Sequence, residues 1–108
     1  MLLSNQKIIE YANRIDAFKS KGYKIPFDLR RALKKNTTTL VEEYQIFDEA
    51  RKEIFSGDLD DDKKNDEVYA LLNNEIEVDI IQVPVNILSD IMMDPLDEDL
   101  IEFMLIDK

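Results

Sequence analysis

The amino-acid sequence predicts a mainly α-helical fold of one small domain, built on a long antiparallel helical hairpin. Three observations support this prediction. The chain has 108 residues, and 44% of them are hydrophobic, which is enough for one packed core. It contains only two glycines and three prolines, too few for the many turns of a β-sandwich. Apolar residues also recur at helical spacing over two long stretches.

The first helix is predicted to begin after Ser4, because serine is a favoured N-cap residue. Its apolar stripe steps by three or four residues through Ile8, Tyr11, Ile15 and Phe18. The helix is expected to end near Gly22, within the stretch KSKGYK, since glycine and lysine both suit a helix C-terminus.

A longer second helix is predicted from Pro26 to Ser56, because proline is well tolerated in a first helical turn. Its stripe runs through Leu29, Leu33, Thr37, Leu40, Tyr44, Phe47, Arg51 and Ile54. The two helices should form an antiparallel hairpin over residues 1–56. Residues 36–39, NTTT, are mediocre helix formers, so a kink or break there remains open.

Residues 68–108 are predicted to cap this hairpin with short helices and one strand. Alternating apolar and polar residues predict the strand over residues 76–83. Because one strand is not stable alone, it needs a partner. That partner stays open between residues 22–25, the extreme N-terminus and another chain, with a small intramolecular ribbon favoured.

Three short helices are predicted in the same part of the chain, over residues 66–74, 85–93 and 95–106. The last of them is apolar at six of the seven positions 100–106, which is typical of a helix buried on several sides. It is therefore expected to cover the far half of the long second helix.

Residues 57–67, GDLDDDKKNDE, are predicted to form an acidic loop between the hairpin and its cap. The formal net charge of the chain is −10. Residues 1–56 have a net charge of +3, and residues 57–108 have a net charge of −13. The electrostatic character of the domain therefore changes near Gly57.

Neither a metal site nor a catalytic site is expected. Counted from Asp58, an EF-hand would need glycine at its sixth position and glutamate at its twelfth, where this chain has Lys63 and Tyr69. The chain has no Cys and no His, the commonest metal ligands and neutral-pH bases. It also has no phosphate-binding glycine loop and no nucleophile motif. We therefore expect no enzymatic activity, no metal ion and no cofactor.

A cytoplasmic location is expected. The sequence has no apolar run of about 18 residues, so it predicts no membrane span. Its start, MLLSNQKIIEYANR, lacks the charged lead and the small-residue cleavage site of a secretory signal.

Two charged sets are candidate interaction sites. The acidic set should bind a protein partner with a basic surface, while its charge opposes direct binding of nucleic acid or anionic membrane. Its candidate residues are Asp58, Asp60, Asp61, Asp62, Asp66, Glu67, Glu75, Glu77 and Asp79. The second set is a basic patch at the hairpin tip, formed by Lys21, Lys24, Arg30, Arg31, Lys34 and Lys35. This patch should be solvated, pair with the acidic half, or meet the acidic half of a second copy in a homo-oligomer.

Four segments together resemble a family of small phage and prophage proteins of unknown function. These are KIPFDLRRAL, YQIFDEARKEIF, EIEVDIIQVP and LDEDLIEFMLI, in this order along most of the chain. The resemblance implies a phage or mobile-element origin and an accessory, structural or host-directed role. It brings no catalytic residues.

The expected function is that of a non-catalytic phage-type accessory or inhibitor protein. Its acidic surface would bind a host or defence protein and block a nucleic-acid-binding channel, in the manner of an anti-CRISPR protein or a nucleic-acid mimic. One alternative is a phage structural or assembly protein that acts by self-association. A second alternative is a DNA-binding regulator that uses Arg30, Arg31, Lys34 and Lys35.

Overall fold

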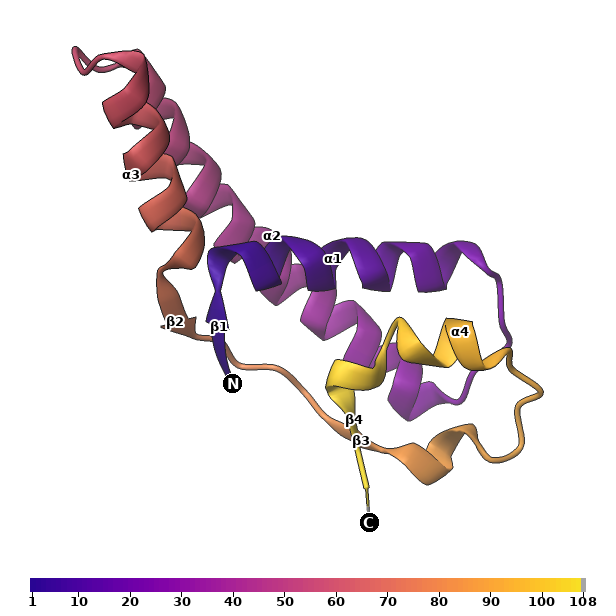
Figure 1. Ribbon diagram of the computed structural model, residues 1–108. Helices are drawn as coiled ribbons and strands as arrows, with labels where there is room; N and C mark the ends of the chain where they lie inside the picture. Colours follow the sequence, from indigo (N-terminus) through magenta and orange to yellow (C-terminus); the bar gives the residue numbers. More distant parts are fainter. Residues whose placement is uncertain (108) are drawn as a thin grey trace.

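The computed structural model describes residues 1–107 and confirms a mainly helical fold with small sheets and short C-terminal turns (Figure 1). The molecule is elongated, with extents of 55 × 24 × 20 Å. In chain order its elements are β1 (Leu2–Ser4), α1 (Asn5–Ser20), α2 (Phe27–Ser56), α3 (Asp61–Asn73), β2 (Glu75–Glu77), β3 (Val83–Pro84), the 3-10 turn η1 (Val85–Leu88), α4 (Pro95–Asp99), the 3-10 turn η2 (Glu102–Met104) and β4 (Leu105–Ile106).

The predicted hairpin of α1 and α2 is confirmed. Ser4 caps α1, because its Oγ accepts a hydrogen bond from the Lys7 N–H at 3.1 Å. Gly22 follows the helix with φ of 73°, a left-handed conformation that glycine adopts without a steric cost. The buried side chains of the two helices form most of the core, and they are Ile8, Ile15, Phe18, Leu29, Ala32, Leu33 and Leu40.

Helix α2 is continuous through residues 36–39, where the sequence left a break open. Asn36 is fully buried in this stretch. Its Nδ2 donates to the Ile81 carbonyl at 2.9 Å, and its Oδ1 accepts from the Ile81 N–H at 2.8 Å. The side-chain amide thus satisfies both backbone groups of a residue that lies outside any strand.

The strand prediction over residues 76–83 is wrong in its length. The structure contains two short strands there, β2 and β3, with an irregular segment between them. Strand β2 pairs antiparallel with β1, opposing Leu3 to Ile76, so the N-terminus is the partner that the sequence left open. Strand β3 pairs parallel with β4. The two strands are separated because Asn36, not a neighbouring strand, binds the backbone of Ile81.

The two C-terminal helices predicted over residues 85–93 and 95–106 are also shorter than expected. Only η1 and the five-residue α4 form, and η2 and β4 replace the rest. Long-range packing explains the difference, because Ile101 and Met104 are fully buried in the core. The rings of Tyr11 and Phe103 also stack, with their centroids 4.0 Å apart. These contacts fix the segment on α1, so it does not cover the far half of α2.

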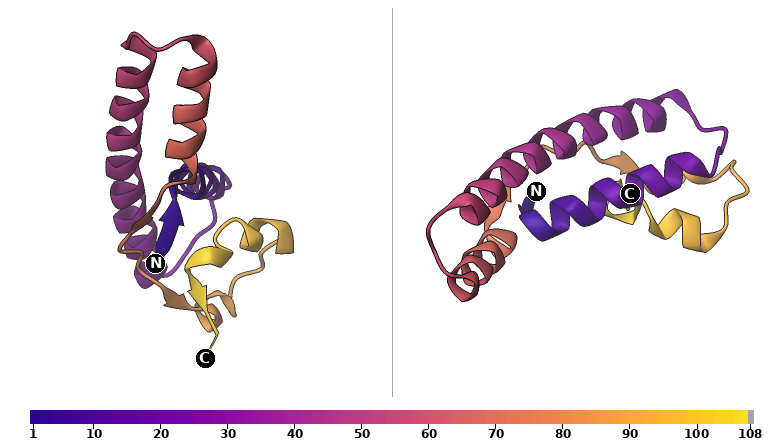
Figure 2. Two further views of the ribbon diagram at one scale, coloured as in Figure 1. Left: turned by 60° about the vertical axis from the view of Figure 1, so that its left-hand side comes forward. Right: turned by 90° about the horizontal axis from the view of Figure 1, so that it is seen from above.

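Helix α3 covers that half of α2 instead, and most of the predicted acidic loop belongs to this helix (Figure 2). The loop is confined to residues 57–60. Asp60 caps α3, because its Oδ1 accepts from the Lys63 N–H at 2.9 Å, and the acidic first turn suits the helix dipole. We call residues 42–73 the distal hairpin, and residues 1–41 and 74–107 the body; the distal hairpin projects from the body in Figure 1.

Tyr23 ties α4 to the connection between α1 and α2. Its hydroxyl donates to Oδ2 of Asp97, and the Asp94 N–H donates to the Tyr23 oxygen at 3.4 Å. The hydrogen bond to Asp97 requires the protonated phenol, so it raises the pKa of Tyr23 above its ordinary value.

Stability is therefore expected to fall when Tyr23 ionises. Because its folded pKa lies above the unfolded value of about 10, the contribution is complete below about pH 10 and is lost as the pH rises through the folded pKa. Chemical denaturation of the wild type and of Tyr23→Phe should differ below that pH and converge above it. A stability difference that stays constant up to about pH 11 would contradict this assignment.

Candidate protein-binding surface

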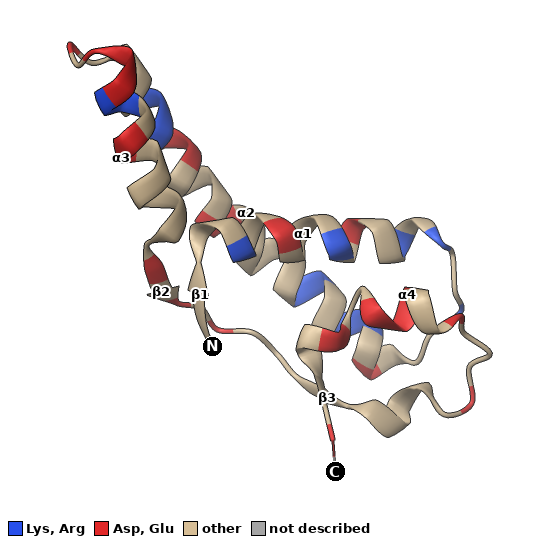
Figure 3. Cartoon of the chain, viewed as in Figure 1, with Lys and Arg blue, Asp and Glu red and all other residues tan. Residues whose placement is uncertain are grey.

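The distal hairpin has acidic residues on α2, in the loop and on the first two turns of α3 (Figure 3). Residues 42–73 contain eleven Asp/Glu and four Lys/Arg, which gives a net charge of −7. Acidic character therefore begins in the second half of α2, not at Gly57 as the sequence division suggested. The apolar contact between the helices is modest, since Phe47 is buried while Val68, Leu71 and Leu72 are only half-buried.

The acidic residues predicted as a partner-binding face fall into two groups. Six lie in the loop and the first two turns of α3, and they are Asp58, Asp60, Asp61, Asp62, Asp66 and Glu67. The other three, Glu75, Glu77 and Asp79, lie beyond the C-terminus of α3, in and after β2. Residues 68–73 separate the groups by about 9 Å of helix at 1.5 Å per residue. The negative charge of the second group is also partly neutralised, because the Met1 amino group lies 2.6 Å from Oε1 of Glu77.

One exposed side of α3 combines carboxylates with an aromatic ring. Asp62, Asp66 and Tyr69 are spaced by four and three residues, so they share the side opposite the inward Val68. Tyr69 is 71% exposed. We call these three residues the outward face of α3. Both aspartates belong to the acidic set predicted from the sequence, but Tyr69 does not, although its spacing from them and its absence from the apolar stripe identify it.

A similar arrangement on α2 was also missed. Ile46 is 62% exposed, and Glu42, Glu49 and Glu53 lie four residues before it and three and seven residues after it. These glutamates fall within the half of the chain that has a positive net charge, so the division by halves concealed them. The helical spacing would have shown that they share one side of α2.

Most carboxylates of the distal hairpin have no cation beside them. Asp48 is the exception, because the Arg51 guanidinium and then the Lys52 ammonium hold its pKa below the usual range. Within residues 1–107, none of the six predicted acids in the loop and the first two turns of α3 forms an ion pair within 4.0 Å. Their charge is therefore available to an external partner.

Of the predicted basic patch, Arg30, Arg31, Lys34 and Lys35 lie at the opposite end of α2, and Lys21 and Lys24 lie in the connection that precedes this helix (Figure 3). An open groove of about 520 Å³ runs along it. We call it the basic groove; it is lined by Phe27, Arg30, Arg31, Lys34, Lys35, Thr38 and Thr39. Of the six predicted patch residues, only Lys21 forms an ion pair within the described chain, to Asp97 at 3.6 Å.

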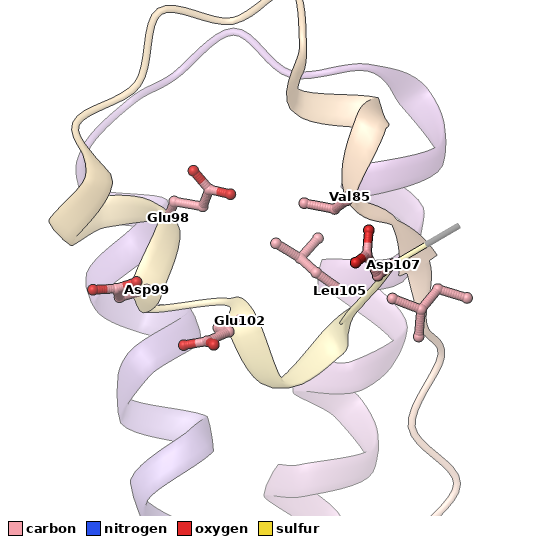
Figure 4. A pocket seen from close by; sticks show the side chains of 7 residues that line it. Val85, Glu98, Asp99, Glu102, Leu105 and Asp107 are labelled. Atoms are coloured by element: carbon pink, nitrogen blue, oxygen red, sulfur yellow. The ribbon is translucent and has the colours of Figure 1, made fainter.

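A third feature is an acidic pocket near the C-terminus, with a volume of about 300 Å³ (Figure 4). Its carboxylates are spread around the rim and do not converge on one point. They belong to Glu98, Asp99, Glu102 and Asp107. Within residues 1–107, no three Asp or Glu side chains are arranged to bind a metal ion. Across the whole of the described residues 1–107, no helix is long and apolar enough to span a membrane.

Comparison with known proteins identifies no relative: no protein-family model, curated protein or solved structure matches this chain. The resemblance to small phage proteins therefore stays a prediction.

Proposed function

We propose that the chain is a non-catalytic, phage-type accessory protein whose distal hairpin binds a basic surface of a host or defence protein that handles nucleic acid. In this proposal the hairpin occupies the surface, and its carboxylates repel the phosphates that would otherwise bind there. The protein would act in the cytoplasm of an infected or lysogenic bacterial host.

The proposal rests on one observation, the outward face of α3. Within residues 1–107 its two carboxylates form no ion pair within 4.0 Å, and the exposed Tyr69 lies between them and the base of the hairpin. Tyrosine is enriched among the residues that dominate protein–protein binding energy, because it buries a large rigid surface and still donates a hydrogen bond. Aspartates around it would steer a basic partner and set its orientation.

The separation of the acidic residues favours a local contact over a continuous imitation of a duplex. Duplex DNA has one charge per ~1.7 Å along its axis. The uncharged residues 68–74 separate the acids of the distal hairpin from those in and after β2, and the start of α3 includes Lys63 and Lys64. A partner site about as long as one short helix suits this surface better than a channel that grips many base pairs.

Affinity capture tests the proposal. The immobilised chain would be exposed to nuclease-treated bacterial lysate as the wild type and as the triple variant Asp62→Asn/Asp66→Asn/Tyr69→Ala. The matched control is Glu98→Gln/Asp99→Asn, which removes two charges at the C-terminal pocket. We expect the wild type and the control to retain a nucleic-acid-handling protein that elutes at about 0.5 M salt, where the screening length is only a few Å. The triple variant should bind it about 30-fold more weakly, as loss of one aromatic anchor alone implies.

A second measurement separates inhibition from simple binding. The purified partner is mixed with its labelled nucleic acid, and the wild-type chain is added. Displacement by the wild type and the control, but not by the triple variant, supports blocking of a nucleic-acid site. Equal capture by wild type and triple variant, or a partner that keeps its nucleic acid when the chain is bound, would refute the proposal.

A further inference from the structure

We propose that the basic groove of one copy binds the outward face of α3 of a second copy, so that the protein self-associates head to tail. The contact uses the same face of α3 as the proposed function, but it depends on residues of the basic groove that the proposed function does not require. Self-association would cover the outward face of α3 and compete with any external partner.

Charge that is not neutralised within the molecule is the first reason. Arg30, Arg31, Lys34 and Lys35 form no ion pair within residues 1–107, and neither do Asp62 and Asp66. The two sets lie at opposite ends of the same molecule, whose long extent is 55 Å (Figure 3). They are too distant to pair with each other, but each can pair with the opposite end of a second copy.

The distribution of charge along α2 is the second reason. The helix dipole favours acidic residues near the N-terminus and basic residues near the C-terminus. Apart from Asp28 near its start and Arg51 and Lys52 near its end, α2 has the reverse arrangement: four cations lie in residues 30–35, five acidic residues lie in residues 42–53, and the last turn contains Glu53 and no basic residue. Helix stability therefore does not account for the segregation, whereas attraction between the ends of two copies does.

The spacing of the residues is the third reason. The sequence Phe27, Arg30, Lys34 steps by three and then four residues along α2. Read in the opposite direction, Tyr69, Asp66, Asp62 also steps by three and then four residues along α3. An antiparallel contact of the two helices thus places Tyr69 against Phe27, Asp66 against Arg30 and Asp62 against Lys34. Both aromatic rings are free to meet, since Phe27 is 72% exposed and Tyr69 is 71% exposed.

The two surfaces of this contact are different, so the contact is heterologous. Each copy that is bound through its groove still presents a free α3 face, and each copy bound through α3 still presents a free groove. Such contacts extend into chains or close into rings. Removing one surface from each of two variants should therefore stop the growth at a dimer.

Two double variants test this. The face variant is Asp62→Asn/Asp66→Asn, and the groove variant is Arg30→Gln/Lys34→Gln. At about 0.05 M salt, where screening is weak, light scattering of the wild type should give a mean mass that rises with concentration above the monomer mass of 12.7 kDa. Each variant alone should stay at 12.7 kDa, and an equimolar mixture should reach about twice that mass and no more. At about 0.5 M salt all samples should be monomeric.

Several outcomes would overturn the inference. A wild type that stays at 12.7 kDa at every concentration contradicts it, and so does a mixture that behaves like its components. Binding of a duplex oligonucleotide by a monomeric wild type, but not by the groove variant, would assign the groove to nucleic acid. The groove variant also distinguishes this inference from the proposed function, because it should lose self-association and still capture the external partner.

Discussion

Replacing Asn36 with alanine is expected to destabilise the fold by about 3 kcal/mol, one of the largest effects of any single substitution in this chain. The change removes two hydrogen bonds, of 2.9 and 2.8 Å, to the backbone of Ile81. It leaves the N–H and C=O of Ile81 unpaired beside the core and opens space at a fully buried site. Small domains have a total stability of only about 5–15 kcal/mol, so the variant should unfold at much lower denaturant concentration.

Two further substitutions make this prediction specific. Thr38→Ala changes an exposed residue two positions along the same helix and should alter the free energy of unfolding by less than about 0.5 kcal/mol. Asn36→Asp keeps an acceptor for the Ile81 N–H but directs a carboxylate at the Ile81 carbonyl. Since a protonated carboxyl can donate to that carbonyl, this variant should lose less stability at about pH 4 than at neutral pH. Equal stability of Asn36→Ala and Thr38→Ala in urea denaturation would contradict the assigned role of Asn36.

Asn36 also shows why the sequence predicted part of the fold and not the rest. The stripes of α1 and α2 are local signals, because each buried position is three or four residues from the next. The hydrogen bonds between Asn36 and Ile81 join residues 45 positions apart. The periodicity of the sequence does not indicate such a long-range contact. The sequence therefore suggested a possible break in α2 at residues 36–39, where the structure has a buried and hydrogen-bonded asparagine.

The helix prediction for residues 95–106 was wrong for a related reason. Its apolar density correctly indicated burial, since Ile101 and Met104 are fully buried. Density alone does not specify which surface a segment covers, and short 3-10 turns bury these residues as well as a long helix would. The helix that does cover the far half of α2 begins within the acidic run.

The start of α3 was predictable from rules that favour aspartate at helix N-termini. Residues 57–67 are rich in carboxylates and contain no apolar side chain except Leu59, and a loop was therefore predicted. Asp60, however, is an N-cap followed by two more acids in the first turn, which is the arrangement that the helix dipole favours. Applying those rules at Asp60 in place of Asp66 gives α3 its observed start, and then places Asp62, Asp66 and Tyr69 on one side.

The distal hairpin is expected to open locally far more often than the body. Helix α3 contributes no fully buried residue, and Phe47 is the one buried apolar side chain that α2 contributes within residues 42–56. The base of the hairpin is held by Asn5, whose Nδ2 donates to the Leu71 carbonyl at 2.8 Å. Few buried contacts mean a low free energy of local opening. Amide hydrogens of α3 should therefore exchange about 100-fold faster than those in the middle of α1.

Phe47→Ala should increase this difference without unfolding the body. Truncating a buried phenylalanine costs about 3 kcal/mol, which corresponds to about two powers of ten in the opening equilibrium. Hydrogen exchange read by mass spectrometry should show α3 nearly unprotected, while α1 and the first half of α2 keep their protection. Ile46→Ala is the matched control, because the Ile46 side chain, next to Phe47 in the sequence, is 62% exposed. Removing it should leave the exchange rates within about twofold of those of the wild type. If Phe47→Ala accelerated exchange equally in α1 and α3, the hairpin and the body would form one cooperative unit. In that case, partner-binding defects in hairpin variants would have to be separated from loss of the whole fold.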